Sequence, residues 1–231
     1  MRGQAGLALG LVWYAVFVFS IVYHEAAHGL ASWRFGDATA RGAGLVTLNP
    51  LPHIQREPVG MLAAPVVSYV MGGWMIGWAS TPINSDWAAR NPRQAALVGL
   101  SGPAANLALA VLAGLLIRAG TAAGVFVRPG VIEFARVVSG EGWFWSGLAA
   151  GISILFTLNL LLFVFNLIPV PPLDGSSWAE LVLSGRLLSA YRAIMAQPGV
   201  QAIGIVVAWM ALRFIYGPVL VTALRILYIG R

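Results

Sequence analysis

Residues 19–33, FSIVYHEAAHGLASW, form an apolar stretch that is broken by three ionisable side chains within five positions: His24, Glu25 and His28. The chain as a whole is strongly apolar, since 59% of its 231 residues are hydrophobic and 10% are charged. Each ionisable residue in a membrane-spanning helix costs roughly 2.5–3.5 kcal/mol on insertion, and such residues usually mark a functional site. The grouping therefore predicts a site inside a membrane helix.

Apolar runs of membrane-spanning length recur on both sides of this stretch. The clearest lie at roughly 6–32, 95–117, 144–168 and 200–228, the last being a C-terminal span, and a less regular run covers 59–80. Lipid cannot satisfy exposed backbone groups, and these runs are continuous rather than alternating, so they predict helices. We expect an all-α, polytopic membrane helix bundle of about four to six membrane segments, formed by residues 1–231 as a single integral-membrane domain.

Composition excludes several classes of site and partner. The chain has no cysteine, which rules out disulfides and thiolate metal ligands. The net charge is +6 and every basic residue is arginine, which suits contact with anionic lipid headgroups in a bilayer. The sequence has no basic stripe of the kind that would indicate a nucleic-acid partner. The first run has no small-residue cleavage site, so we expect it to be retained rather than removed as a signal peptide.

Three segments between the spans differ in character. Residues 34–58, RFGDATARGAGLVTLNPLPHIQREP, are rich in glycine and proline and predict a short irregular or stranded segment after the first helix. The run 59–80 contains Pro65 and a Gly-Gly pair, which loosen a helix. The stretch 118–143 mixes charged and apolar residues and predicts an interfacial piece rather than a span.

His24, Glu25 and His28 form the pattern H-E-x-x-H. Residues four apart lie on one face of a helix, so both histidines can bind one metal ion with the glutamate beside them. In metalloproteases with this pattern the histidines bind Zn²⁺ and the glutamate takes the proton of a zinc-bound water. The alternative is a chance match, which the cost of burying these groups in a membrane disfavours.

A catalytic zinc site needs a third protein ligand, and Asp174 is the candidate. It stands in FNLIPVPPLDGSSWAE, residues 165–180, where prolines end a helix and a glycine lets the backbone turn. The alternative is that Asp174 only caps the following helix or forms a solvated turn. Ser177 and Glu180 have the spacing of a capping box and predict the start of that helix. With His24 and His28, the aspartate would complete a His₂-carboxylate set.

With these motifs the sequence resembles the site-2 proteases, the intramembrane zinc metalloproteases of peptidase family M50. The resemblance rests on four blocks in the family's order: HEAAHG at 24–29, LNPLPHIQREPVG at 48–60, GLSGPAAN at 99–106 and FNLIPVPPLDG at 165–175. It is greatest for the small prokaryotic branch without a PDZ domain. Two positions depart from the pattern: DGSSW replaces the frequent Gly-Gly-Arg or Gly-Ser-Arg continuation, and Ser80 stands where a lysine is expected.

The resemblance implies a function and a set of roles. His24, His28 and Asp174 would be the zinc ligands and Glu25 the general base. The substrate would be a transmembrane helix of another protein, cut in regulated intramembrane proteolysis. The enzyme would be a multi-pass protein of the cell membrane with its active site toward the cytosolic side. This side follows from the resemblance alone, since the arginines are nearly balanced and do not decide sidedness.

Three further residues are candidates for contact with the substrate or the transition state. The resemblance places the amide of Asn166 beside the metal, and the alternative for it is an interhelical hydrogen bond. For Asn106, in a small-residue motif that indicates close helix packing, we favour a structural amide. For His53, a loop histidine, we favour a structural role over an approach to the site.

The positions of the predicted ligands also constrain the topology. The two histidines end the first span and Asp174 follows the span 144–168, so both spans must point the same way. This favours one full crossing between them, at 95–117, with 59–80 dipping into the membrane and returning. Residues 78–84, WASTPIN, would then lie on the active-site face, where extended backbone could pair with an unwound substrate.

Two rival functions remain at this stage. A metal transporter would also carry histidine and aspartate in its spans, but it would not need the glutamate, and transporters often show paired repeats that this chain lacks. A catalytically inactive membrane scaffold of the same fold is the second rival. Retention of all four presumptive catalytic groups argues against it.

Overall fold

The computed structural model describes residues 2–195, 197 and 199–229. Its framework is four long apolar helices, each of a length and composition that can cross a membrane. They are α1 (Arg2–Arg34), α6 (Pro92–Ala122), α7 (Gly142–Asn166) and α10 (Val200–Leu227). These helices coincide with the four clear predicted spans, and they confirm the all-α polytopic bundle.

Shorter elements join the long helices. They are α2 (Thr39–Gly42), α3 (Pro50–Arg56), the π-helical turn η1 (Val59–Ala63), α4 (Ala64–Gly72), α5 (Ser85–Arg90), β1 (Phe126–Val127), β2 (Ser139–Gly140), α8 (Gly175–Val182) and α9 (Gly185–Met195).

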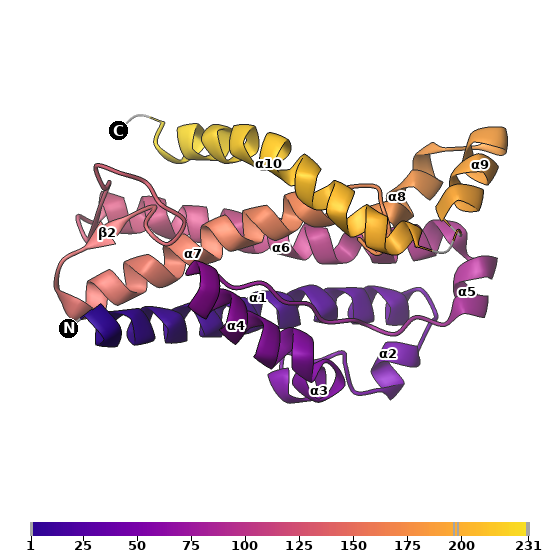
Figure 1. The fold of residues 1–231 in the computed structure, drawn as a ribbon, viewed down its shortest axis with the longest axis horizontal. Helices are drawn as coiled ribbons and strands as arrows, with labels where there is room; N and C mark the ends of the chain where they lie inside the picture. The colour runs from indigo at the N-terminus through magenta and orange to yellow at the C-terminus, as the bar shows by residue number, and fades with distance from the viewer. Residues whose placement is uncertain (1, 196, 198, 230–231) are drawn as a thin grey trace.

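Helices α1, α6 and α7 pack against one another along the long axis of the molecule, with α1 and α7 running in the same direction and α6 running in the opposite direction (Figure 1). Contacts along α1 follow this arrangement: Trp13 stacks on Phe134 just before α7, and further along α1 Ser20 accepts a hydrogen bond from Asn159 of α7. The parallel course of α1 and α7 is the one that the predicted ligand set requires.

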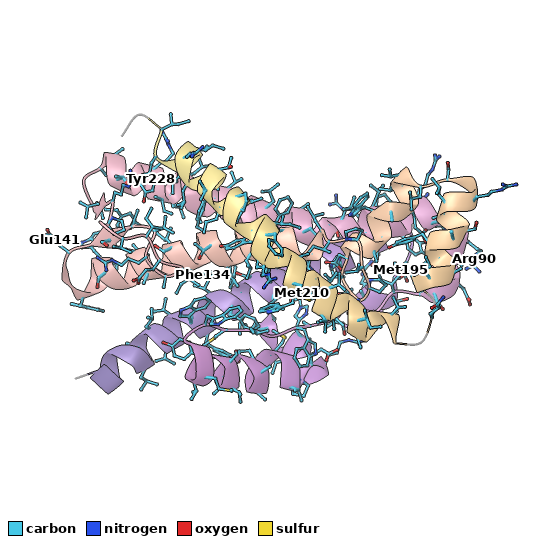
Figure 2. The ribbon with its side chains drawn as sticks, turned by 45° about the horizontal axis from the view of Figure 1, so that its top comes forward. Arg90, Phe134, Glu141, Met195, Met210 and Tyr228 are labelled. Carbon is cyan, nitrogen blue, oxygen red and sulfur yellow. The ribbon has the colours of Figure 1, made fainter. Side chains whose placement is uncertain are left out.

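Different residues and core clusters lie toward the two ends of the molecule. Arg90 and Met195 lie at one end, and Glu141 and Tyr228 lie at the other (Figure 2). A core cluster centred on Trp13, Phe17, Met61 and Ile154 packs α1 against α7 and the segment after α3. Near the Tyr228 end, a second cluster joins α6, α7 and the end of α10 around a two-stranded pair.

That strand pair accounts for the charged stretch 118–143. Helix α6 extends to Ala122, and β1 and β2 then form an antiparallel pair. The backbone N–H groups of Val137 and Val138 both donate to the hydroxyl oxygen of Ser153 on α7. As predicted, the stretch is not a span, because its backbone folds back on the helices.

Residues 34–58 are irregular, as predicted, but the strand alternative for them was wrong. Two short helices, α2 and α3, occupy this segment instead. Asn49 caps α3 with its side chain, which accepts a hydrogen bond from the N–H of Leu51. Proline follows this cap at the first position of α3, where its missing N–H costs nothing.

The run 59–80 forms a hairpin. Its helical part ends at Gly72, because Gly73 adopts a left-handed backbone with φ of 75°. Residues 74–84 then run back without regular secondary structure; we call this segment the returning strand, although it pairs with no other strand of the described chain. The hydroxyl of Ser80 donates to Glu57 Oε1 at 2.5 Å, so the two ends of the hairpin meet. Close packing of its two arms depends on Gly60, since a Cβ there would lie 2.2 Å from the carbonyl oxygen of Trp78.

Helix α8 begins earlier than the predicted capping box. Its first residue is Gly175, and Asp174 stands at the N-cap position without a side-chain capping hydrogen bond. Ser177 therefore lies inside the first turn instead of preceding it, so the capping-box prediction was wrong. Its side chain faces Gly99 of α6, where an added Cβ would lie 2.5 Å from the Ser177 hydroxyl oxygen.

Candidate metal centre

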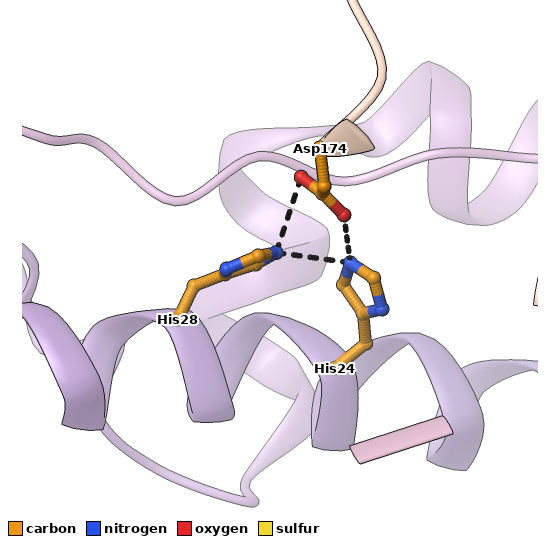
Figure 3. A group of neighbouring side chains, drawn as sticks. All are labelled: His24, His28 and Asp174. Atoms are coloured by element: carbon orange, nitrogen blue, oxygen red, sulfur yellow. Dashed lines mark hydrogen bonds and ion pairs between the residues drawn. The ribbon is translucent and has the colours of Figure 1, made fainter. Parts of the chain in front are cut away.

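His24, His28 and Asp174 lie together at the junction of α1 with the start of α8 (Figure 3). The two Nε2 atoms are 3.0 Å apart. Asp174 Oδ2 lies 3.0 Å from His24 Nε2, and Oδ1 lies 3.3 Å from His28 Nε2. The histidines are buried, with 5% and 6% of their surface exposed. One nitrogen from each imidazole and a carboxylate therefore converge on a single point.

The convergence fits a tetrahedral zinc ion. With zinc bonds of about 2.0–2.1 Å, neighbouring ligand atoms of such a site lie about 3.3 Å apart, close to the separations found here. Asp174 Oδ2 is buried and accepts no hydrogen bond among the described residues. Opposite the ligands, α6 presents Gly102, where a Cβ would lie 2.3 and 2.5 Å from the Nε2 atoms of His28 and His24. Glycine thus leaves open the space that an ion needs.

Hydrogen bonds on the far side of each ring leave Nε2 free to bind a metal. His24 Nδ1 donates to Asn106 Oδ1 at 2.5 Å, and His28 Nδ1 donates to the carbonyl oxygen of Val98 at 2.7 Å. Both acceptors are on α6. Since a neutral imidazole carries one N–H, a donor at Nδ1 leaves the Nε2 lone pair facing the other ligands.

Glu25 lines the same cavity as His28 and Asp174, which has a volume of about 240 Å³. Glu25 is 6% exposed, and Thr81 Oγ1 donates a hydrogen bond to its Oε2 at 2.7 Å. Oε1 accepts no hydrogen bond within the described part of the chain. The glutamate can therefore take a proton through Oε1 while Thr81 holds the other oxygen.

Thr81 belongs to the returning strand of the hairpin, residues 74–84, which is fixed at several points. Arg56 Nε donates to the carbonyl oxygen of Ser80 at 3.0 Å. At the end of the strand, the N–H of Asn84 donates to Asp37 Oδ2 at 2.9 Å. The strand is therefore held across the cavity beside Glu25.

Asp37 binds this strand as a carboxylate. Burial alone would raise its pKa, but hydrogen bonds from the hydroxyl and N–H of Thr39 and from the N–H of Asn84 outweigh burial, and the pKa is lowered from 3.8. At neutral pH the group is ionised and accepts all three hydrogen bonds. The anchor of the strand is thus a charged one.

The remaining predicted site residues lie in different places. Asn106 is fully buried beside His24, on the side away from the cavity. Asn166 is the last residue of α7, is partly buried, and is not among the residues that line the cavity. His53 is 1% exposed in α3, where Nε2 donates to the carbonyl oxygen of Thr47 at 3.1 Å. Its Nδ1 has no hydrogen-bond partner within the described residues.

Two residues of the site were missed by sequence reasoning. Thr81 stands in polar loop sequence, and nothing in a single sequence shows that its hydroxyl reaches Glu25. Gly102 belongs to the small-residue motif GLSGPAAN, which we interpreted only as a sign of close helix packing. What the motif packs against could be learned only from the structure.

Comparison with known proteins assigns the chain to one peptidase family. The family model of peptidase family M50 matches residues 12–211. A Bacillus subtilis protein named "Putative zinc metalloprotease YwhC" is 34% identical to this chain over 170 residues. The match covers 72% of this chain and 68% of the relative. No solved structure gives a significant match.

Two mycobacterial relatives, each named "Putative zinc metalloprotease Rip2", extend the comparison. The Mycolicibacterium smegmatis protein is 37% identical over 161 residues, covering 70% of this chain and 53% of its own length. The Mycobacterium tuberculosis protein is 32% identical over 166 residues, covering 72% of this chain and 55% of its own length. The matched part of the chain thus spans about half the length of these two relatives.

Proposed function

Because the chain belongs to peptidase family M50, we propose that this membrane metalloprotease hydrolyses peptide bonds in or near the transmembrane helices of other membrane proteins. Zinc is the cofactor that the relatives' names and the His-His-Asp group support. His24, His28 and Asp174 would hold it. The observation that carries the proposal is a buried glutamate in the same cavity as two of these ligands, His28 and Asp174.

A zinc ion bound there would polarise the scissile carbonyl and bring the pKa of the attacking water to about 7. Glu25 then accepts the proton of that water at Oε1 and returns it to the leaving amine. The Thr81 hydroxyl keeps the carboxylate turned toward the cavity by holding Oε2. The tetrahedral oxyanion calls for a further donor, and the amide of Asn166 stays our candidate from the family resemblance.

The substrate would bind as an extended chain along residues 79–83. None of the hydrogen bonds among the described residues uses the N–H groups of Ala79, Ser80, Thr81 or Ile83, so this strand has an open edge beside the cavity. Edge strands with free backbone groups accept another strand. A helical substrate must unwind to do this, which limits cleavage to segments with weak helix propensity.

We place the protein in the cell membrane as a multi-pass protein, with the cavity toward the cytosolic side. Four helices that can span a bilayer support the first part. The second part rests on the family resemblance. Regulated intramembrane proteolysis, in which the substrate has already been shortened, is the corresponding process.

The experiment combines metal analysis with a cleavage assay on the purified chain in detergent. We expect one zinc per chain and cleavage of a transmembrane peptide, with the cleavage lost on chelation and restored by zinc. Zinc without cleavage of any transmembrane peptide would favour the inactive scaffold. Transport of zinc into vesicles without cleavage would favour the transporter.

A further inference from the structure

A buried chain of polar side chains runs from the candidate metal centre through three helices. His24 of α1 donates to Asn106 of α6, and Asn106 Nδ2 donates to Asn159 Oδ1 of α7 at 2.8 Å. Asn159 Nδ2 donates in turn to the hydroxyl oxygen of Ser20 at 2.8 Å, which returns the chain to α1. Asn106, Asn159 and Ser20 each have 0% of their surface exposed.

Two backbone carbonyls at the far end give this chain one direction. Ser20 Oγ donates its hydrogen to the carbonyl oxygen of Val16 at 2.8 Å, so it can only accept from Asn159. Asn159 Nδ2 also donates to the carbonyl oxygen of Leu155 at 2.8 Å. The NH₂ group of Asn159 must therefore face Ser20, and its oxygen must face Asn106.

The same reasoning passes along the chain to the histidine. Asn106 has to present its NH₂ group to Asn159, so its oxygen faces His24. An amide oxygen can only accept, and Nδ1 of His24 must carry the hydrogen. The lone pair then lies on Nε2, the atom next to Asp174. The tautomer of His24 is in this way set by residues on α7 and one turn back on α1.

We propose that Asn159 and Ser20 are positioning residues for the metal centre, which act through Asn106 to keep His24 in its metal-binding tautomer. This inference rests on the proposed function. Without Asn159, the Asn106 amide is free to rotate and present NH₂ to Nδ1, which favours the tautomer with hydrogen on Nε2. That tautomer has no lone pair on Nε2 and cannot bind a metal through that atom. Loss of such outer hydrogen bonds costs about 10–100-fold in metal affinity in other proteins.

His28 offers an internal reference. Its Nδ1 donates to the backbone carbonyl of Val98, which no side-chain substitution removes. A matched control is Thr157, which lies on the same helix as Asn159, is 1% exposed and donates to the carbonyl oxygens of Phe134 and Ser153. Its hydroxyl makes no hydrogen bond to Ser20, Asn106 or Asn159, so Thr157→Val removes a buried hydroxyl on the same helix and leaves the hydrogen bonds to His24 in place.

The test measures zinc affinity by competition with a chelator in purified Glu25→Gln protein, so that no catalysis is involved. We expect Asn159→Leu to weaken zinc binding by about 10-fold or more. Ser20→Ala should weaken it by about 2–10-fold, the equivalent of one hydrogen bond. Thr157→Val should bind zinc like the parent. If Asn159→Leu did not fold, Ser20→Ala would decide.

A second readout follows the imidazole hydrogen directly. The chain has only three histidines, so ¹⁵N-histidine NMR of the zinc-loaded protein can follow the Nδ1–H of His24 and of His28 separately. Asn159→Leu should speed hydrogen exchange at His24 and leave His28 unchanged. Parental zinc affinity and an unchanged His24 signal in both variants would overturn the positioning role. Failure of the Glu25→Gln parent to bind zinc would instead overturn the proposed function.

Discussion

Glu25 is the residue at which metal binding and hydrolysis can be separated. Glu25→Gln keeps the size of the side chain but removes its ability to accept a proton. We expect full zinc content and a loss of hydrolysis of about 10²–10⁴-fold, whereas His24→Ala and His28→Ala should lose the zinc itself. Metal analysis and peptide cleavage on the same preparations provide the check. A Glu25→Gln protein that cut near the wild-type rate would rule out the base assignment.

Asp174 distinguishes a ligand from a helix cap. Its side chain makes no capping hydrogen bond to α8, although it stands at the N-cap position. We therefore expect Asp174→Ala to lose zinc and activity together. A cap would behave differently, lowering stability by about 0.5–2 kcal/mol with the metal retained. Zinc content measured beside thermal unfolding tells the two apart.

Gly102 is a third single-residue test, because a metal ion bound by the proposed ligands would need the space that it leaves open. In Gly102→Ala the new methyl group would lie within 2.5 Å of both Nε2 atoms, so we expect zinc binding to be lost. The control is Gly147→Ala in α7, where nothing lies within 4 Å of the added Cβ. That change should leave zinc binding intact. Equal zinc content in both variants would show that the ligands can move aside and that the space is not required.

In the proposed mechanism, the returning strand of the hairpin links substrate binding to the base. Thr81→Val removes the hydroxyl that holds Glu25, and a hydrogen bond to a charged group is worth about 1.5–3 kcal/mol. We expect kcat to fall about 10-fold or more with zinc content unchanged. Thr81→Ser keeps the hydroxyl and should retain most of the activity. Wild-type kcat in the valine variant would remove Thr81 from the mechanism.

The anchor of this strand at Asp37 predicts a pH dependence. The folded pKa of Asp37 is lowered, so its stabilising effect is fully present above the unfolded pKa and is lost as pH falls through the folded pKa. At pH 7 we expect Asp37→Asn to unfold at a lower temperature than wild type. The difference should shrink as the pH falls below 3.8, the ordinary pKa of the group, and should be lost once the pH is below the lowered pKa of the folded protein. A difference independent of pH would mean that the charge does not matter.

For the molecule as a whole, sequence reasoning succeeded where hydropathy or spacing carries the information. The four long helices follow from apolar runs that match the membrane thickness, and the two histidines share a face because they are four residues apart. It failed where contacts between distant segments decide. The strand that binds Glu25 and the early start of α8 at Gly175 both depend on packing against α6 and α1, which one sequence does not reveal.

The topology can be tested with cysteines, since the chain has none of its own. Ser80 hydrogen-bonds to both Arg56 and Glu57, so we expect the hairpin to enter and leave the membrane on one side. Arg56→Cys and Arg90→Cys should then react with an impermeant thiol reagent from the same face. Labelling from opposite faces would make residues 59–80 a complete crossing.

The separation of the ligands along the chain has a consequence for biosynthesis. Asp174 follows His28 by 146 positions, and a ribosome that adds about 5–20 residues per second needs roughly 7–30 s to reach it. During that interval the first helix is already made, while α6 and α7, which receive its imidazole hydrogens and complete its polar contacts, are still being synthesised. With the proposed ligand set, the metal site can therefore form only after residue 174 has been added, and the nascent chain would be inactive while its first helices insert.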